Sequence, residues 1–348
     1  MDIKKYVVSN DPKMYEAWPD VVLTDGGKLI CVFSECDHHG CRDNARIMIT
    51  ESTDRGRTWS NKYPLTEKTC NDDFFNCARI SKLNDGTLAI VCDRMTYTRD
   101  EKGNRVSRKA VGYLWRADAE GENWSAPEVL PFCGIVPDKL LQLECGRLIY
   151  ASHFEGEGSF GCSGNLEQYM WYSDDNGETW SDRITIAKSP DYKLCEVSIL
   201  ELKNGDLAAF MRENSFMGID CLKCISHDKG ETWEGIYRMP IPGCHRPVTG
   251  YLCDGRILMT YRYENAANLP FIGCDNVFMS YFDEKSALET ERGKQWVRTI
   301  PLDHDFNDVP DLGYTGWVQF PDGEIYVVNY IKDDADKAQI RGYSFFLP

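Results

Sequence analysis

The sequence has no excess of positive charge and no long apolar run. Its 39 lysines and arginines are outnumbered by 55 aspartates and glutamates, which gives a formal net charge of −16. Because phosphate contacts need clustered Lys and Arg, we expect no nucleic-acid partner. No uninterrupted apolar stretch approaches the roughly 20 residues that a membrane-spanning helix needs, so we expect no membrane partner either.

The start of the chain also lacks the apolar core of a signal peptide, since residues 1–8 read MDIKKYVV. We therefore expect a cytoplasmic protein whose 15 cysteines are free thiols, and the odd number agrees with this. Residues 36–41 read CDHHGC, but the spacing is not that of a standard zinc site and no second cluster follows. We expect neither a metal ion nor another cofactor.

A convincing amphipathic helix of normal length is missing as well, and repeated turn motifs occur instead. Residues 52–59, 173–180 and 226–233 share the pattern S-x-D-x-G-x-T-W, and residues 118–124 carry a variant with one extra residue. In such a box aspartate accepts hydrogen bonds from turn amides, glycine supplies a positive φ, and tryptophan packs between repeat units. We interpret the boxes as structural.

A second repeat covers the whole chain. Each copy is an apolar strand, a glycine turn and another apolar strand, as in a β-hairpin. The turn glycines are Gly27, Gly86, Gly146, Gly205, Gly255 and Gly323. They lie 50 to 68 residues apart, and six units of the 348-residue chain average 58 residues. The pattern predicts an all-β protein, a six-bladed β-propeller of four-stranded antiparallel blades.

We expect residues 1–348 to form one domain in which both ends of the chain share the last blade. Residues 338–346 would be the third strand of that blade, and the N-terminal strand at residues 4–8 would complete it. Closing the ring in this way removes free strand edges.

The repeat also locates a candidate site, because the innermost strands of a propeller surround its axis. Counting nine residues back from each turn glycine gives Trp18, Cys77, Pro137, Glu196, Arg246 and Tyr314. Counting seven residues forward gives Ser34, Asp93, His153, Arg212, Arg262 and Tyr330. Equivalent positions of a repeat normally hold interchangeable packing residues, whereas these are chemically diverse. We therefore predict a functional site at the axis, with solvated loop ends as the alternative.

The boxes on a six-bladed pattern resemble the sialidase superfamily over essentially the whole chain. The segment that begins at Glu196 resembles the one carrying the glutamate that assists the nucleophile, and the segment that begins at Tyr314 resembles the one carrying the tyrosine nucleophile. The resemblance implies that Tyr314 attacks the sugar and that Glu196 takes its proton. A neutral phenol suits this role because a carboxylate nucleophile would be repelled by a substrate carboxylate.

The resemblance implies two further roles. Arg212, 16 residues after Glu196, matches a family arginine that binds the substrate carboxylate. Asp43, in the loop of the first blade, matches the catalytic acid and base, and Asp37 in the same loop is its rival.

The other two arginines of the family clamp are missing. The first clamp arginine is expected at the start of the first strand of the first blade, where the sequence has Trp18. The third is expected within residues 274–280, which contain no arginine. We expect Arg246 and Arg262 to join Arg212 in a displaced clamp, which still favours an anionic ligand.

The remaining axial residues are candidate substrate contacts. Trp18 would supply a sugar-stacking face or, alternatively, pack between strands. Arg94 is a further candidate for the clamp because it lies next to Asp93. Asp93, His153 and Tyr330 are candidate polar contacts.

The resemblance implies a retaining exo-glycoside hydrolase that releases a terminal anionic sugar, sialic acid or a related one, from a small molecule or an oligosaccharide. Two alternatives stay open. One is a hydrolase or lyase of the same fold that acts on a uronate or a neutral glycan, and the other is a non-catalytic glycan-binding propeller. The sequence does not indicate an oligomeric state.

Overall fold

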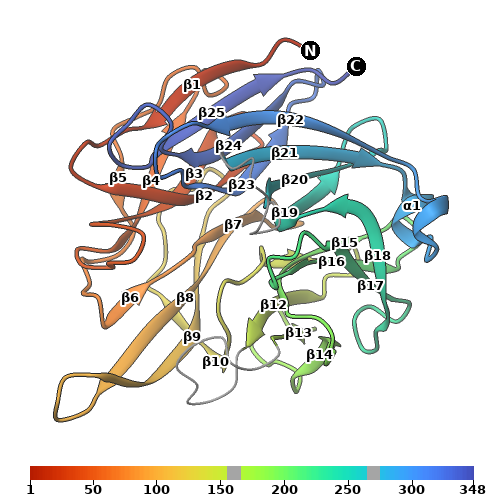
Figure 1. Cartoon of the computed structure of the whole chain (residues 1–348), viewed down its shortest axis with the longest axis horizontal. Helices are drawn as coiled ribbons and strands as arrows, with labels where there is room; N and C mark the ends of the chain where they lie inside the picture. Colours follow the sequence, from red (N-terminus) through yellow and green to blue (C-terminus); the bar gives the residue numbers. More distant parts are fainter. Residues whose placement is uncertain (155–165, 265–274) are drawn as a thin grey trace.

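Six β-sheets stand around a common axis as the blades of a propeller (Figure 1). The computed structural model describes residues 1–154, 166–264 and 275–348. Neighbouring strands within each sheet run antiparallel, for example β2 with β3 (Tyr15–Leu23 and Leu29–Cys36). The prediction of an all-β, six-bladed propeller is confirmed.

Three blades follow one another from the first hairpin. Blade 1 consists of β2 (Tyr15–Leu23), β3 (Leu29–Cys36), β4 (Arg46–Ser52) and β5 (Tyr63–Pro64). Blade 2 consists of β6 (Asp73–Phe75), β7 (Arg79–Lys82), β8 (Leu88–Arg99), β9 (Arg105–Ala117) and β10 (Glu128–Cys133). Blade 3 consists of β11 (Leu141–Gln142), β12 (Leu148–Phe154), β13 (Glu167–Ser173) and β14 (Ile184–Ala187).

The other three blades complete the ring. Blade 4 consists of β15 (Leu194–Glu201), β16 (Leu207–Glu213), β17 (Asp220–Ser226) and β18 (Glu234–Pro242). Blade 5 consists of β19 (Cys244–Tyr251), β20 (Ile257–Tyr263), β21 (Asp275–Phe282) and β22 (Val297–Asp305), with α1 (Glu284–Leu288) and the 3₁₀ turn η1 (Arg292–Lys294) between its last two strands. Blade 6 consists of β23 (Leu312–Gln319), β24 (Ile325–Ile331), β25 (Gln339–Phe345) and β1 (Lys4–Ser9).

Blade 2 departs from the four-strand pattern. Two short strands, β6 and β7, both pair with β8 in place of one continuous inner strand. Its hairpin β8–β9 is also long and projects from the rest of the ring (Figure 1).

The glycine turns close the inner hairpins as expected. Gly27 has a φ of 85°, and its N–H donates to the carbonyl of Thr24 at 3.0 Å. Gly205 repeats this geometry in blade 4, with a φ of 86° and a 2.8 Å bond to the carbonyl of Leu202. A side chain would be strained at such a φ, so the repeat in the sequence is a repeat of backbone geometry.

The S-x-D-x-G-x-T-W boxes order turns and fill space between blades. Asp175 accepts hydrogen bonds from the backbone N–H of Thr179 at 2.8 Å and from the hydroxyl of Ser173 at 2.7 Å. Bonds from Thr179, followed by the one from Ser173, lower the pKa of Asp175 to about 2. Trp180 packs edge-on against Phe132 of the neighbouring blade, with 5.1 Å between ring centroids. The boxes are therefore turn and packing elements.

The hydrophobic core lies between adjacent blades. Phe33 of blade 1 and Val328 of blade 6 belong to one buried cluster, and Ile30 of blade 1 and Ile80 of blade 2 belong to another. Each such side chain contributes about 1.5–3 kcal/mol when fully buried. Because every blade packs against two neighbours, the ring holds the axial ends of the inner strands in fixed positions.

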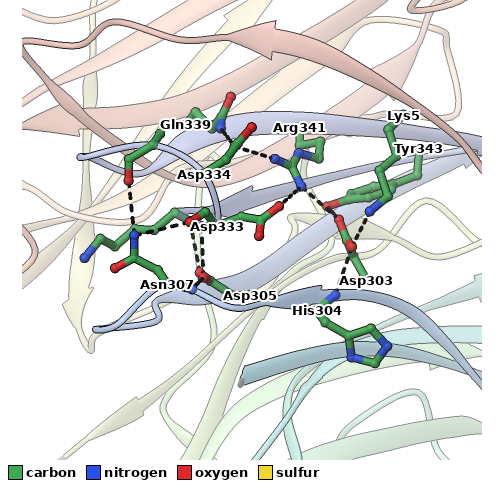
Figure 2. A network of polar contacts seen from close by, with 12 residues as sticks. Lys5, Asp303, His304, Asp305, Asn307, Asp333, Asp334, Gln339, Arg341 and Tyr343 are labelled. Atoms are coloured by element: carbon green, nitrogen blue, oxygen red, sulfur yellow. Dashed lines mark hydrogen bonds and ion pairs between the residues drawn. The ribbon is translucent and has the colours of Figure 1, made fainter. Parts of the chain in front are cut away.

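Polar contacts tie the last blade to its neighbour (Figure 2). Strand β1 pairs with β25, so that Tyr6 lies opposite Gly342. Asp303, on β22 of blade 5, accepts hydrogen bonds from Tyr343 at 2.8 Å and Arg341 at 3.2 Å, and it also pairs with Lys5 of β1. The N-terminal strand is thus fixed to blade 6 by its ladder and to blade 5 by a charged contact.

Candidate active site at the propeller axis

Four innermost strands carry a local break at equivalent positions. The ladders of β2, β15, β19 and β23 shift register at Trp18, Glu196, Arg246 and Tyr314. These residues have φ values of 55°, 47°, 53° and 55°, which place all four in the left-handed region. Such a conformation costs about 1–2 kcal/mol for a residue other than glycine, and bulges of this kind redirect side chains next to active sites. At four of its six positions, the count of nine residues from the turn glycine therefore coincides with a strained bulge.

Three of the predicted residues form one hydrogen-bonded chain. The hydroxyl of Tyr314 donates to Oε1 of Glu196, and Nη1 of Arg212 donates to Oε2 of the same carboxylate at 2.8 Å. Glu196 and Arg212 are buried, while Tyr314 is partly exposed and so accessible to a ligand. The structure brings these residues together from blades 4 and 6, 118 positions apart in the sequence.

The charges around this chain fix its protonation state. Burial raises the pKa of Glu196, but the positive charges of Arg212, Arg246 and Arg262 outweigh burial and hold that pKa far below its usual range. Burial and then the charge of Glu196 raise the pKa of Tyr314 well above its usual value. The resting site therefore holds an ionised glutamate that accepts from a neutral tyrosine.

Arg246 and Arg262 flank the same tyrosine. Their guanidinium carbons lie 5.6 Å and 5.8 Å from the centroid of the Tyr314 ring. Arg246 is fully buried and donates from Nη2 to the carbonyl of Pro137 at 2.7 Å. Among the described residues its Nε and Nη1 have no partner. Buried donors are normally satisfied, so these two nitrogens are available to a ligand with acceptor oxygens.

Asp93 and His153 lie on the second strands, behind the inner ring. Asp93 accepts from the side chain of Asn76 at 3.1 Å, and burial raises its pKa to about 6. Nδ1 of His153 accepts the backbone N–H of Glu196 at 3.4 Å, and both residues are buried. These contacts place Asp93 and His153 as supports of the inner strands, with His153 directly behind the catalytic candidate Glu196.

Tyr330 is a buried neighbour of the nucleophile candidate. Its ring centroid is 6.4 Å from that of Tyr314 and 6.0 Å from that of Trp18. Its hydroxyl donates to Oδ1 of Asp311 at 2.8 Å, and the residue has no exposed surface. The structure therefore places Tyr330 beneath Tyr314, where it fixes the position of the ring.

Trp18 offers no open face to a sugar. Only 2% of the residue is exposed, and the guanidinium carbon of Arg42 lies 3.6 Å from its ring centroid. His39 packs against it edge-on at 5.3 Å. The expectation of a sugar-stacking tryptophan is corrected in favour of the packing alternative, because the face that would stack is covered by Arg42.

Arg94 also lies apart from the axial cluster. Its guanidinium forms a bidentate pair with Asp73 at 2.7 and 2.8 Å and lies 5.2 Å from the ring of Phe75. Successive residues of a strand point to opposite faces, so the side chains of Asp93 and Arg94 diverge. Arg94 is therefore not part of the clamp in this structure.

The two acid candidates lie in the loop between β3 and β4. Asp43 accepts the backbone N–H of Asn71 at 2.9 Å and a weak bond from the thiol of Cys41 at 3.5 Å. Asp37 accepts from the side chain of Asn44 at 3.0 Å. Both carboxylates are partly exposed, and none of these hydrogen bonds reaches the tyrosine–glutamate pair. The choice of Asp43 stays a prediction.

Sequence reasoning missed two residues at the edge of the site, Arg42 and Asp311. Arg42 donates to the side-chain oxygen of Asn76 at 3.2 Å in addition to covering Trp18. Asp311 accepts from Tyr330 and pairs with His39 at 2.7 Å. Neither residue lies at a position counted from a turn glycine. The only sequence signal for them is that Arg42 adjoins Asp43 and that Asp311 lies three residues before Tyr314.

No metal centre is found in the described ranges. Within residues 1–154, 166–264 and 275–348, no group of three His, Cys, Asp or Glu side chains is arranged to hold a metal ion. All cysteines of the same ranges are free thiols, and no helix there is long and apolar enough to cross a membrane. Residue 274, part of the segment expected to lack the third arginine, is outside the described residues.

Fold and site together define the class of the protein: a six-bladed propeller of divergent sialidase-like type. The chain belongs to the BNR repeat-like domain family, whose family model matches residues 95–327. A sialidase of Paraclostridium sordellii is 24% identical over 262 residues, which cover 67% of this chain and 62% of that protein. The chain thus spans less than two thirds of the length of this curated relative.

Solved structures share the fold. A protein of unknown function from Dyadobacter fermentans superposes with a TM-score of 0.79 and 18% identity, covering 99% of each chain. The intramolecular trans-sialidase of Ruminococcus gnavus in complex with oseltamivir carboxylate gives a TM-score of 0.66 at 13% identity, covering 96% of this chain and 94% of that one.

Proposed function

We propose that this protein is a sialidase-like, retaining exo-glycoside hydrolase that releases a terminal anionic sugar, sialic acid or a related one. The observation that carries the proposal is the hydrogen-bonded chain from Tyr314 through Glu196 to Arg212. A tyrosine whose proton faces an ionised carboxylate is an activated nucleophile. The similarity to a curated sialidase supports the same reaction class.

In the proposed reaction, the phenolic oxygen of Tyr314 attacks the anomeric carbon while its proton passes to Glu196. Asp43 protonates the leaving oxygen as the glycosidic bond breaks, which leaves a sugar bound to tyrosine. Asp43 then takes a proton from water, whose oxygen attacks the anomeric carbon and displaces Tyr314. The phenolate recovers its proton from Glu196, so both groups return to their starting state.

The arginines give this site its preference for an anion. Arg212, Arg246 and Arg262 lie around the carboxylate of Glu196, and Arg262 also pairs with Glu264 at 3.6 Å. Three guanidinium groups against these two carboxylates leave positive charge in excess. The same charges would stabilise the phenolate that develops on Tyr314 during attack and departure. The two unpartnered nitrogens of Arg246 are suited to a substrate carboxylate.

A panel of fluorogenic glycosides tests the proposal. It should include sialosides, other ulosonates, uronides and neutral sugars, each assayed with the whole chain. We expect release from the first two classes, with retained anomeric configuration by NMR, and none from neutral sugars. Release from neutral sugars alone would overturn the assignment of an anionic substrate.

A second candidate function within the same fold is favoured by the residue at position 18. The resemblance expects the first arginine of the substrate clamp there, and the structure has a tryptophan covered by Arg42. The anionic sugar would then be a uronate, and a lyase would use Tyr314 as a base without forming a covalent intermediate. An unsaturated product that absorbs in the ultraviolet would indicate the lyase. Binding of a sugar without turnover across the whole panel would indicate a glycan-binding module.

The free cysteines support the proposal that the enzyme works in a reducing, cytoplasmic compartment on small glycosides or oligosaccharides.

A further inference from the structure

The loop between β3 and β4 contains an exposed histidine that the proposed reaction does not use. This residue, His39, belongs to the segment CDHHGC, for which the sequence suggested no metal role. Its side chain is 44% exposed, yet its Nδ1 lies 2.7 Å from Oδ2 of Asp311. Holding a half-exposed ring in one orientation reduces its conformational freedom, so the contact calls for an explanation.

The carboxylate that holds His39 is part of a buried network. Asp311 accepts hydrogen bonds from Tyr15 and, at 2.8 Å, from Tyr330. Burial raises the pKa of Asp311, but the bond to His39 and those from the two tyrosines outweigh burial and lower it. Asp311 therefore stays ionised and fixes the histidine tautomer that carries its proton on Nδ1.

A second aspartate, Asp305, holds the loop that carries Asp311, and Figure 2 shows it beside Asn307 and Asp333. Asp305 is fully buried and accepts the backbone N–H of Asp311 at 3.1 Å. It also accepts the N–H groups of Asn307 at 3.0 Å, Lys332 at 3.0 Å and Asp333 at 2.9 Å. Four amides from two loops thus converge on one carboxylate, which fixes the loop that presents Asp311.

A row of aromatic rings connects His39 to the nucleophile candidate. Its ring centroid is 5.3 Å from that of Trp18, which is 6.0 Å from that of Tyr330. Tyr330 in turn lies 6.4 Å from Tyr314. His39 is the exposed end of this row, on the same loop as the acid candidate Asp43.

We propose that His39 binds the leaving group of the glycoside by a hydrogen bond between Nε2 and a sugar hydroxyl. Among the described residues, hydrogen-bond partners are found for Nδ1 and none for Nε2. Asp311 directs Nε2 away from the buried network, and Asp43, on the same loop, protonates the leaving oxygen in the proposed reaction. The inference rests on that proposed function, and it makes the protein selective for a sugar as the leaving group.

The test compares two substrates of the same anionic sugar, one with an aryl leaving group and one with a disaccharide as leaving group. The variant is His39→Phe, which keeps a ring against Trp18 and removes both nitrogens. Loss of one neutral hydrogen bond predicts that kcat/KM for the oligosaccharide falls about three- to tenfold, with the aryl glycoside changed by less than about twofold. An equal loss on both substrates, or none on either, would overturn the proposal.

His227 is a matched control. It is 58% exposed and its Nδ1 lies 2.9 Å from Asp206 of blade 4, so it has the same Asp–His geometry. His227→Phe should change neither substrate. Asp311→Asn should reproduce the selective loss of His39→Phe, because a neutral amide offers one acceptor oxygen to Tyr15, Tyr330 and His39 and no longer fixes the Nδ1 proton of the ring. Wild-type selectivity in a folded Asp311→Asn variant would contradict the role of Asp311 as a positioning residue.

Failure of the proposed function is distinguishable from failure of this inference. If the wild-type protein hydrolyses neither substrate, the hydrolase proposal fails. Calorimetric titration with the intact oligosaccharide and with the free anionic sugar then tests His39 alone. His39→Phe should bind the oligosaccharide more weakly than the wild type does and bind the free anionic sugar equally well. If the wild type and His39→Phe bind the oligosaccharide with equal affinity, the contact is refuted.

Discussion

Arg246 is fully buried, and two of its nitrogens have no partner in the part of the chain that the structure describes. This state costs free energy and is unusual for a side chain that serves only the fold. We predict that Arg246→Met weakens binding of the anionic sugar about ten- to hundredfold, since hydrogen bonds to charged groups contribute about 1.5–3 kcal/mol each. The same variant should also be less stable than the wild type, because the carbonyl of Pro137 loses a donor and the buried carboxylates of Glu196 and Asp138 lose a compensating charge. Calorimetric affinity and urea denaturation measure the two effects.

Arg94→Met is the control for this substitution. Arg94 is paired with Asp73 outside the axial cluster, so its loss should leave affinity for the anionic sugar unchanged. A drop in affinity as large as that of Arg246→Met would mean that the charge of the whole face attracts the ligand, and that no particular arginine binds it.

Tyr314→Phe removes one oxygen atom and with it the proposed nucleophile. We expect kcat to fall by more than about a thousandfold, as when other catalytic nucleophiles are removed, with an unchanged melting temperature. Loss of the bond to Glu196 leaves that carboxylate paired with Arg212, which protects the fold. Full activity in the variant would exclude Tyr314 as nucleophile.

His153 gives the protein a defined response to acid. Burial, partly opposed by Glu196, lowers its pKa to about 3, compared with about 6.5 in an unfolded chain. Between these values the unfolded state binds the additional proton, so stability is lost as pH falls from about 6.5 towards 3. In His153→Gln the free energy of unfolding should depend less steeply on pH in this range, by about 1.4 kcal/mol per pH unit.

His227 is the control for the pH measurement, because the bond to Asp206 raises its pKa. The stabilisation from protonated His227 is fully present below the pKa of histidine in the unfolded chain and is lost as pH rises. His227→Gln should therefore not reduce the slope of the unfolding free energy against pH between about 3 and 6.5. Equal slopes for the wild type and His153→Gln would contradict the buried, neutral state of His153.

At the level of residues, the sequence located the inner-strand positions and could not locate loop residues. Glu196 and Tyr314 could be proposed as neighbours at the axis because the repeat fixes their distance from a turn glycine. Asp311 was missed because its position is set by amide bonds to Asp305, a contact without any period. Arg94 pairs with Asp73 for a local reason, since a neighbour of Asp93 on a strand faces the other way.

At the level of elements, the inner strands of blades 1 and 6 approach so closely that only glycine fits at Gly316. A Cβ atom there would lie 2.2 Å from Oδ1 and 2.7 Å from Cα of Asp20 on β2. Gly316→Ala should therefore lower the free energy of unfolding by about 1–3 kcal/mol or more, because backbone has to move. Gly293→Ala, where nothing lies within 4 Å, should cause no loss in the same denaturation assay.

The order of strands was predictable because each inner hairpin has a glycine in its turn. The split of the inner strand of blade 2 into β6 and β7 was not, because it depends on pairing of both with the long strand β8. The short helix α1 was also missed. It begins where Asp283 accepts the N–H of Ser286 at 2.8 Å, a cap that stabilises only one and a half turns.

At the level of the molecule, the ring depends on the pairing of β1 with β25. Deletion of residues 1–9 removes this ladder and the burial of Val8, whose side chain alone contributes about 1.5–3 kcal/mol. We predict a lower midpoint in urea and concentration-dependent association, because the edge of β25 becomes free to pair. Lys5→Met keeps the strand and loses only a half-exposed ion pair, so it should cost less than about 1 kcal/mol.

The bulges at the axis have a consequence for redesign. The β-ladder resumes within two residues of each left-handed position, at Val197 after Glu196 and at Gly316 after Tyr314. A side chain at such a position can be exchanged while its strand keeps its partners. A randomised library over positions 196, 246 and 314 would therefore vary polar groups of the axial site while the strands keep their ladders.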